Sequence, residues 1–242
     1  DAVWGPRTQS TYDNLSNIVV PTPPAPEPEP IPTPAPEPAP EPLPAPEPEP
    51  VPEQGTPIIG QTDKSLEYIQ GSLKSLEASD LFIFEMVPAL YSVAVKYGID
   101  PYILIGQSAH ETGWGRFGRA VTPEHHNTCG LKVMYPVGPD DNPKDHARFS
   151  DWNRGATAHA QHLYAYMNKA IPAGEVLIDP RWGWVYGKHN LKFVEELGAK
   201  WAPAITYGTT IVSVANRIRS APSVAVLPPV APVAPVAPVE PV

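Results

Sequence analysis

An alternation of proline with other residues over positions 21–52 limits where this chain can fold. The segment contains 17 of the 35 prolines in the 242-residue sequence. Proline fixes φ near about −65° and lacks a backbone N–H, so neither a helix nor a sheet can accommodate it at every second position. The segment should adopt an extended polyproline II conformation about 100 Å long, at about 3.1 Å per residue. We therefore predict a Pro/Glu-rich extended linker over residues 21–53.

A second proline-rich segment, with an Ala-Pro-Val repeat, predicts a disordered tail over residues 221–242. Between the two segments, residues 54–220 have the composition of a folded body. A body of this size can bury roughly two-thirds of its unfolded surface, which is enough for one self-sufficient core. We therefore expect a single domain over residues 54–220, and a short separate segment over residues 1–20.

The distribution of charge argues against nucleic acid as a partner. The chain has a formal net charge of −9, but residues 54–220 contain 16 acidic and 16 basic side chains. A neutral body lacks the basic surface that nucleic-acid binding requires. The longest apolar stretch, residues 81–95, includes Glu85 and Pro88 and is too short to cross a bilayer. We expect neither nucleic-acid binding nor a membrane span, and we expect a monomer.

The spacing of apolar residues predicts a mainly helical body. Pro88 should kink the second helix, Gly98 should end it, and Asp100-Pro101 should begin the third. Turn residues dominate residues 120–150, where loops or short strands are expected. The expected helices cover residues 62–78, 80–97, 101–111, 152–168, 190–197 and 207–218.

Glu111 has the most distinctive position for chemistry. It ends an apolar helix just before the sequence Gly113-Trp114-Gly115. The negative end of a helix and an apolar environment both disfavour a carboxylate, so the pKa of Glu111 should be raised. A carboxylic acid that stays protonated near neutral pH can protonate the leaving-group oxygen of a glycoside. Trp114 could present an apolar face to a sugar ring.

The residues around Glu111 resemble a known signature. Residues 105–115, IGQSAHETGWG, are similar to the Ala-Gln-x-x-x-Glu-Ser/Thr-Gly-Trp-Gly motif of the endo-β-N-acetylglucosaminidase family of peptidoglycan hydrolases. Three more blocks follow in the family's order: NTCGLK at residues 127–132, a segment over residues 147–163, and LGAKWA at residues 197–202 followed by Tyr207-Gly208. The four blocks cover most of the body.

This resemblance implies an α+β, mainly α fold, in which a lysozyme-like helical domain carries a short loop or β lobe. It implies a glycoside hydrolase that needs no cofactor and cleaves the β-1,4 glycan strand of bacterial cell wall at N-acetylglucosamine. Glu111 matches the family's catalytic acid. Action on the wall would place the protein outside the cell, as a secreted autolysin or a phage lysin.

The family's second carboxylate has no single counterpart in this chain. The resemblance places it in the lobe after the Gly-Leu-Lys block, which is short here, and the candidates are Asp140, Asp141 and Asp145. A polar loop rich in Asp, Asn and Pro is the alternative explanation for these residues. If none of them reaches the site, the 2-acetamido group of the substrate could act as the nucleophile.

Other matched positions are candidates for substrate binding. Many family members have a tyrosine where this chain has Trp201, so the hydroxyl group of that position is missing here. The candidate substrate-binding residues are Trp114, Asn127, Lys132, His146, Trp201 and Tyr207.

The histidines and the single cysteine do not form a metal-binding pattern. His125, His126 and Cys129 lack the fixed spacing of a tetrahedral site. Cys129 is typical of a small buried hydrophobic residue. His159 and His162, three residues apart on one expected helix, should line a core edge or the cleft. We therefore expect no metal.

Residues 1–20 carry a second, shorter resemblance. The sequence DAVWGPRT is similar to the final segment of the small helical peptidoglycan-binding repeat, although a fragment of any turn–helix unit would also explain it. Two other functions stay open for the body: cleavage at N-acetylmuramic acid, as in a lysozyme or lytic transglycosylase, and non-catalytic binding as a wall-binding or virion-structural module. The missing second acid favours the non-catalytic module, and the complete Glu111 block opposes it.

Overall fold

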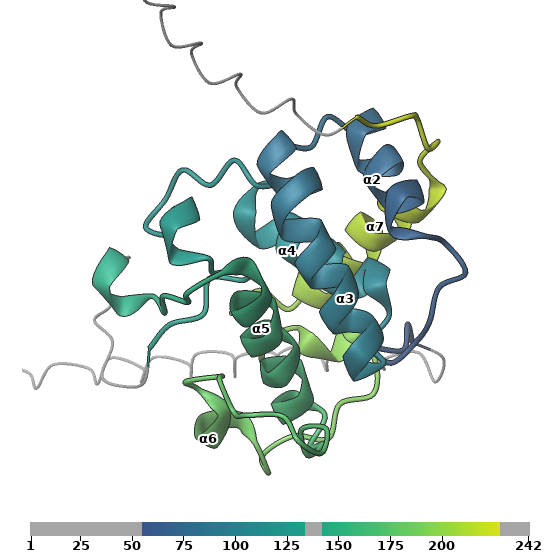
Figure 1. The fold of residues 1–242 in the computed structure, drawn as a ribbon. Coiled ribbons are helices and arrows are strands. Elements are labelled where there is room, and N and C mark those ends of the chain that lie inside the picture. Colours follow the sequence, from purple (N-terminus) through teal and green to yellow (C-terminus); the bar gives the residue numbers. More distant parts are fainter. Residues whose placement is uncertain (1–54, 134–141, 228–242) are drawn as a thin grey trace, which may run out of the picture. The chain divides into compact units, whose positions relative to one another are not determined.

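The computed structural model describes residues 55–133 and 142–227. The predicted N-terminal segment, the linker, Asp140, Asp141 and residues 228–242 of the tail lie outside the described residues. The described part is mainly helical, as the sequence predicts, and its β structure consists of four isolated bridges (Figure 1). None of its helices is both long and apolar enough to cross a membrane.

The first helix, α2 (Leu66–Ser75), is shorter than the expected helix over residues 62–78. Its N-cap is Ser65, whose hydroxyl accepts a hydrogen bond of 3.2 Å from the backbone N–H of Tyr68. A serine in this position satisfies a donor that the first turn of a helix leaves unpaired. The helix therefore begins after the cap, and residues 62–65 stay outside it.

The expected kink at Pro88 takes the form of a π-helix, η2 (Phe82–Met86), which runs directly into α3 (Val87–Tyr97). A proline ring clashes with the carbonyl group four residues earlier. The wider π turn avoids this clash, and the backbone N–H of Val87 bonds to the carbonyl oxygen of Phe82, five residues back. Gly98 ends α3 with φ of 65°, as expected.

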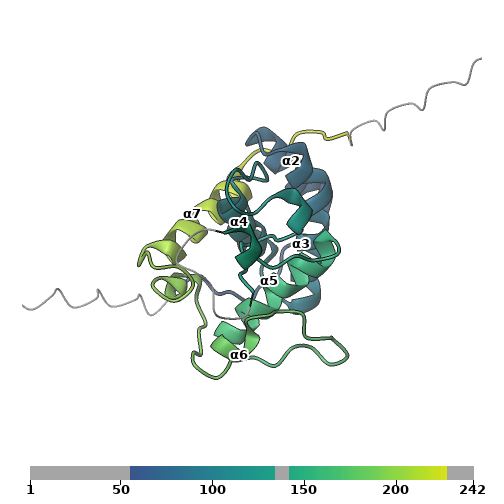
Figure 2. The same ribbon diagram turned by 90° about the vertical axis from the view of Figure 1, so that its left-hand side faces the viewer.

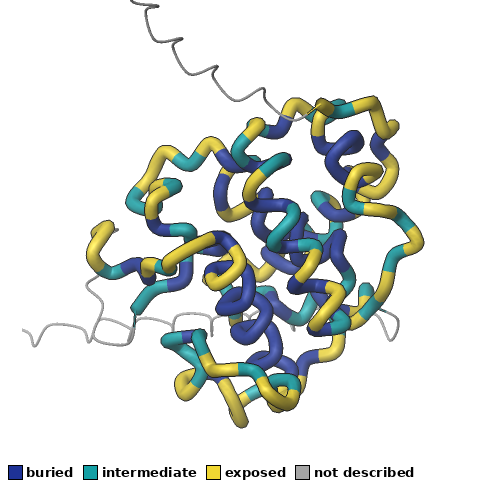
Figure 3. Tube along the Cα trace, in the orientation of Figure 1, coloured by how far each residue is buried: buried dark blue, intermediate teal, exposed yellow. Residues whose placement is uncertain are grey.

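Helix α4 (Pro101–Thr112) is the central helix of the described part. Asp100 caps it by accepting a hydrogen bond of 2.9 Å from the backbone N–H of Tyr102, and Gly113 ends it with φ of 59°. Residues 101–109 are all buried, and α4 packs against α3 and α7 (Figures 2 and 3). The exposed residues of α4 are His110 and Glu111, so the helix carries Glu111 from the core to the surface.

The remaining helices are α5 (Trp152–Tyr166), α6 (Trp182–Val185) and α7 (Tyr207–Ser220). Asp151 caps α5, which packs against α3. The helix expected over residues 190–197 is reduced to the 3₁₀ turn η5 (Val194–Leu197), and α6 was not expected. Helix α7 confirms the last expected helix and extends two residues beyond it.

The expected loop or β lobe contains two 3₁₀ turns, η3 (Pro123–His125) and η4 (Pro143–Asp145). Its described β structure is one antiparallel bridge, between Lys132 and His146. Within the described residues the lobe is thus made of irregular segments, two 3₁₀ turns and one bridge, and the α part of the predicted α+β fold dominates.

The packed part of the chain continues past Ser220 into residues that the sequence assigned to the tail. Ala221 is buried, and its carbonyl oxygen accepts a hydrogen bond of 3.2 Å from the hydroxyl of Ser72 in α2. A side chain at Gly71 would overlap Ser223 and Val224, so these residues lie directly against the backbone of α2. The folded body therefore continues a few residues beyond the predicted boundary at residue 220.

Candidate active site

A cleft of about 760 Å³ opens where α4 ends. Its walls come from the last turn of α4, the loop after it, the lobe, α5, α6 and the segment around Trp201. Glu111 lines this cleft, and among the described lining residues it is the sole carboxylate. Four basic side chains share the lining with it: Arg119, Lys132, Arg181 and Lys200. Acidic and basic side chains are balanced over residues 54–220, but the described cleft lining has an excess of basic side chains.

Two aromatic side chains hold the carboxylate of Glu111. The indole N–H of Trp201 donates to Oε1 of Glu111 at 3.2 Å, and the hydroxyl of Tyr207 donates to the same oxygen. The rings of Trp201 and Tyr207 stack with an interplanar angle of 10°. The fold thus brings together three of the predicted site residues from two distant sequence blocks. Trp201 lacks a hydroxyl group, but its indole N–H donates to Glu111 from this position.

The pKa of Glu111 is raised, as expected. The main cause is burial: the Glu111 residue is open to the cleft, but the surrounding protein atoms desolvate its carboxylate. The hydrogen bond from Tyr207, the neighbouring His110 and the hydrogen bond from Trp201 all lower the pKa, but they do not cancel the effect of burial. Glu111 is therefore suited to carry a proton at a higher pH than an ordinary glutamate.

A line of buried polar side chains extends from Tyr207 into the core. The amide N–H of Gln107 donates to the hydroxyl of Tyr207 at 2.9 Å, and the amide oxygen of Gln107 lies 3.0 Å from Nε2 of His159. Nδ1 of His159 lies 3.2 Å from the hydroxyl of Thr128. Gln107, His159 and Thr128 are fully buried. Gln107 belongs to the motif around Glu111, but its partner on α5 could not be identified from the sequence.

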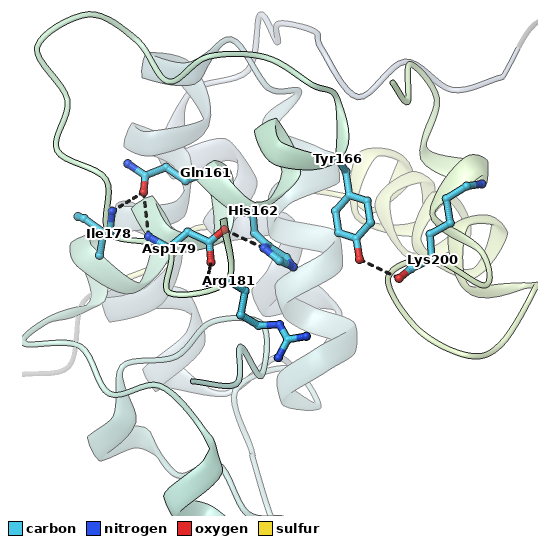
Figure 4. A network of polar contacts seen from close by, with 7 residues as sticks. All are labelled: Gln161, His162, Tyr166, Ile178, Asp179, Arg181 and Lys200. Atoms are coloured by element: carbon cyan, nitrogen blue, oxygen red, sulfur yellow. Dashed lines mark hydrogen bonds and ion pairs between the residues drawn. The ribbon is translucent and has the colours of Figure 1, made fainter. Parts of the chain in front are cut away.

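A second polar network borders the cleft at α5 (Figure 4). Nδ1 of His162 lies 2.8 Å from Oδ2 of Asp179, and the other oxygen of Asp179 accepts a hydrogen bond of 2.8 Å from the backbone N–H of Arg181. The His162 ring is nearly perpendicular to that of Trp201, at 4.9 Å between centroids. His162 lines the cleft, one of the two positions expected for it. Asp179 follows an irregular segment without a motif, so no sequence pattern indicates its contact with His162.

Lys132 and His146, two of the predicted substrate-binding residues, line the cleft, and the backbone bridge between them joins two segments of the lobe. Tyr207 is buried behind Glu111 and does not belong to the described lining, so it contacts the acid and not the cleft. Asn127 touches the lining, but its side chain is occupied by hydrogen bonds to the backbone of Leu131 and Ala147. Asn127 holds the lobe together.

Two other predicted site residues lie elsewhere. Trp114 does not belong to the described cleft lining; its backbone has φ of 59° just after Gly113, which turns the ring toward α7, where Arg217 lies 5.4 Å from its centre. Asp145 is also outside the described lining, and its carbonyl oxygen accepts a hydrogen bond of 2.8 Å from the backbone N–H of Val133. The part of the cleft lining that the structure describes therefore includes neither residue.

Cys129 is buried, as expected, and burial raises the pKa of its thiol well above the usual range. It is therefore a packed thiol, without the properties of a nucleophilic thiolate. Among residues 55–133 and 142–227, no three His, Cys, Asp or Glu side chains are grouped so that they could hold a metal ion.

Comparisons with known proteins place these observations in a family. A family model named glucosaminidase, described as mannosyl-glycoprotein endo-β-N-acetylglucosaminidase, matches residues 87–220. Among solved structures, the catalytic domain of the autolysin Auto from Listeria monocytogenes is similar at 16% sequence identity and a TM-score of 0.36, over 65% of this chain and 89% of that chain. A search of curated proteins gives no match. Because the family model spans more than half of the sequence and includes Glu111 and its partners Trp201 and Tyr207, this chain belongs to the glucosaminidase family.

Proposed function

We propose that this protein hydrolyses the β-1,4 glycan strand of bacterial peptidoglycan at N-acetylglucosamine, with Glu111 as the general acid. Membership of the glucosaminidase family supports a glycoside hydrolase that acts on the cell wall. The observation that carries the assignment of Glu111 is its position: it is the carboxylate among the described cleft residues, with two donors on one oxygen and a raised pKa.

In this mechanism Glu111 gives its proton to the glycosidic oxygen while the bond between that oxygen and C1 breaks. A water molecule finally supplies the hydroxyl group on C1 and returns a proton to Glu111. Asp145 lies outside the described lining. The attack on C1 then comes from a second carboxylate, for which Asp140 and Asp141 outside the described residues stay candidates, or from the substrate's own 2-acetamido group.

The basic lining fits the chemistry of the proposed substrate. The glycan backbone is uncharged, but the peptide stems of peptidoglycan carry carboxylates. Arg119 lines the cleft from the loop after α4 and Lys132 from the lobe, and Arg181 and Lys200 line it from the segments around α6 and Trp201. These side chains can hold the stems while the sugar units pass Glu111. The same chemistry implies that the protein acts at the wall, outside the cytoplasm.

The test is hydrolysis of purified sacculi by the wild type and by Glu111→Gln. The amide keeps the shape of the side chain but cannot release a proton, so the variant should lose hydrolysis and keep binding. Glu67→Gln, which changes an exposed carboxylate of α2, is the matched control and should keep the wild-type rate. If Glu111→Gln retains more than a few per cent of that rate, on the scale expected for loss of a general acid, Glu111 is not the acid.

Mass spectrometry of the fragments identifies the bond. N-acetylglucosamine at the new reducing ends supports the proposal. N-acetylmuramic acid or its anhydro form at those ends would instead assign a muramidase or lytic transglycosylase. Binding of sacculi without any release of fragments by the wild type would assign a non-catalytic wall-binding module.

A further inference from the structure

The buried line behind Glu111 joins four segments that are far apart in the sequence. Tyr207 begins α7, Gln107 lies in α4, His159 lies in α5, and Thr128 belongs to the lobe. Each contact between successive members is within hydrogen-bond distance. Side chains that are buried in this way must satisfy one another, because water does not reach them.

The chemistry of these groups determines which one donates and which one accepts in each hydrogen bond of the line. Burial lowers the pKa of His159 to about 3, with a smaller effect from His162, so the ring is neutral and has a single N–H. Gln107 uses its amide N–H on Tyr207, so its amide oxygen must accept from His159 Nε2. Nδ1 of His159 is then an acceptor, and the hydroxyl of Thr128 donates to it at 3.2 Å in preference to the more distant carbonyl oxygen of Gly155 at 3.5 Å.

If every hydrogen bond of this line ran in the opposite direction, the arrangement at Oε1 of Glu111 would conflict with the hydrogen bond from Trp201. If the amide of Gln107 were reversed, Tyr207 would give its proton to Gln107 and could face Glu111 only as an acceptor. Oε1 of Glu111 would then have to carry the proton itself. That oxygen already accepts the N–H of Trp201, which can only donate. Two fixed donors at Oε1 leave Oε2 as the oxygen that can hold a proton.

We propose that His159 and Gln107 are positioning residues that direct the hydroxyl proton of Tyr207 onto Oε1 of Glu111, so that the catalytic proton is carried by Oε2. This inference rests on the proposed role of Glu111 as the acid. The hydrogen bonds to Glu111 involve Oε1, and the described residues provide no partner for Oε2. Glu111 itself lines the cleft, so Oε2 is the oxygen available to a glycosidic bond.

As a consequence, the protonation of the general acid Glu111 depends on His159, a buried residue that does not contact the substrate. Loss of the His159 N–H frees the amide of Gln107 to reverse, and Tyr207 then no longer stabilises the Glu111 carboxylate. Among the described residues, His110 on α4 and Cys129 in the lobe interact electrostatically with Glu111, and the other titratable and charged groups of the cleft are Arg119, Lys132, His146, His162, Tyr166, Arg181 and Lys200. These groups are unchanged by substitution of His159.

The experiment is a double-mutant cycle in the full chain, with soluble fragments of sonicated sacculi as substrate. His159→Leu and Tyr207→Phe should each lower kcat by about tenfold or more and change KM little. Both should also move the alkaline limb of the pH profile to higher pH. The double variant should be no slower than Tyr207→Phe alone, because His159 acts through the hydroxyl that is already absent. His159→Gln, which can keep an N–H facing Gln107, should restore most of the rate.

Independent effects in the cycle, or an unshifted alkaline limb in His159→Leu, would overturn the inference and leave the role of Glu111 untouched. An inactive wild type would instead refute the proposed function. If His159→Leu does not fold, the line can be tested at Thr128 instead. Thr128→Val removes the hydroxyl that contacts His159, and Thr128→Ser keeps it. Thr128→Val should then be slowed and Thr128→Ser should not, and equal rates for the two would overturn the inference.

Discussion

At the scale of single residues, the donors on Glu111 should be visible in the pH dependence of activity. Catalysis needs the protonated acid, so the rate should fall as pH rises through the raised pKa of Glu111. Trp201→Phe removes a donor that lowers this pKa, so the alkaline limb of kcat/KM should move to higher pH. Trp184→Phe, on the exposed surface of α6, is the control and should not move it. A downward shift in Trp201→Phe would contradict the electrostatic account of the site.

The same carboxylate should cost the protein stability. The pKa of Glu111 is higher in the folded state than its unfolded value of 4.5, because burial penalises the charged form. The folded state therefore loses stability as pH rises from about 4.5 through the raised folded pKa. Glu111→Gln lacks this loss, so its Tm advantage over the wild type should grow from pH 4 to pH 8. A constant difference in Tm across that range would show that the carboxylate is not desolvated.

Sequence motifs proposed candidate site residues that belong to one helix end or to one short block of the chain. Glu111 was found because it ends α4, and Trp201 and Tyr207 because they belong to one short block. Trp114 lies outside the described cleft lining because a run of positive φ values after α4 brings its ring to Arg217 of α7. Asp179 was missed because its contact with His162 joins an irregular segment to a helix, which no spacing encodes.

At the scale of elements, the contact between α5 and the lobe depends on a glycine. A Cβ at Gly155 would overlap the carbonyl oxygen of His126, which belongs to the backbone and cannot move aside easily. Gly155→Ala should therefore destabilise the fold by about 1–3 kcal/mol, the usual cost of overpacking. Gly183→Ala in α6 meets no atom within 4 Å and should be neutral or stabilising by less than about 1 kcal/mol. Urea denaturation of both variants gives the comparison, and equal midpoints would refute it.

The elements that periodicity predicted well are those with a cap and a continuous apolar face. Helix α4 has both, and its start and end agree with the expectation. The segment over residues 190–197 has a helical pattern, but it is fixed by long-range contacts: the carboxylate of Glu195 binds Thr56, and the carbonyl of Val194 lies directly against Gly208. Such contacts select a 3₁₀ turn and cannot be read from local sequence.

At the scale of the whole molecule, the contrast between a neutral body and a basic cleft predicts an electrostatic preference. Binding of stem-bearing glycan fragments should weaken as salt rises from about 0.05 to 0.3 M, and binding of neutral N-acetylglucosamine oligomers should not. Arg119→Gln should weaken the first kind of binding, whereas Arg148→Gln, an exposed side chain outside the described cleft lining, should leave it unchanged. Equal salt dependence for the two ligands would remove the assigned role of the basic lining.

The end of the folded body is also set by packing. A chain of residues 54–220 should fold and hydrolyse soluble fragments, because the proline segments cannot contribute to a core. A chain that continues to Leu227 should be more stable by about 1–3 kcal/mol, since it keeps the burial of Ala221, its hydrogen bond with Ser72 and the cover over Gly71. Both should have the same kcat, because α2 does not contribute to the described cleft lining. Urea denaturation and initial rates separate these two effects. Equal stability of the two chains would show that the contacts of residues 221–227 with α2 do not stabilise the fold. A lower kcat in the shorter chain would show that these contacts also affect the active-site cleft.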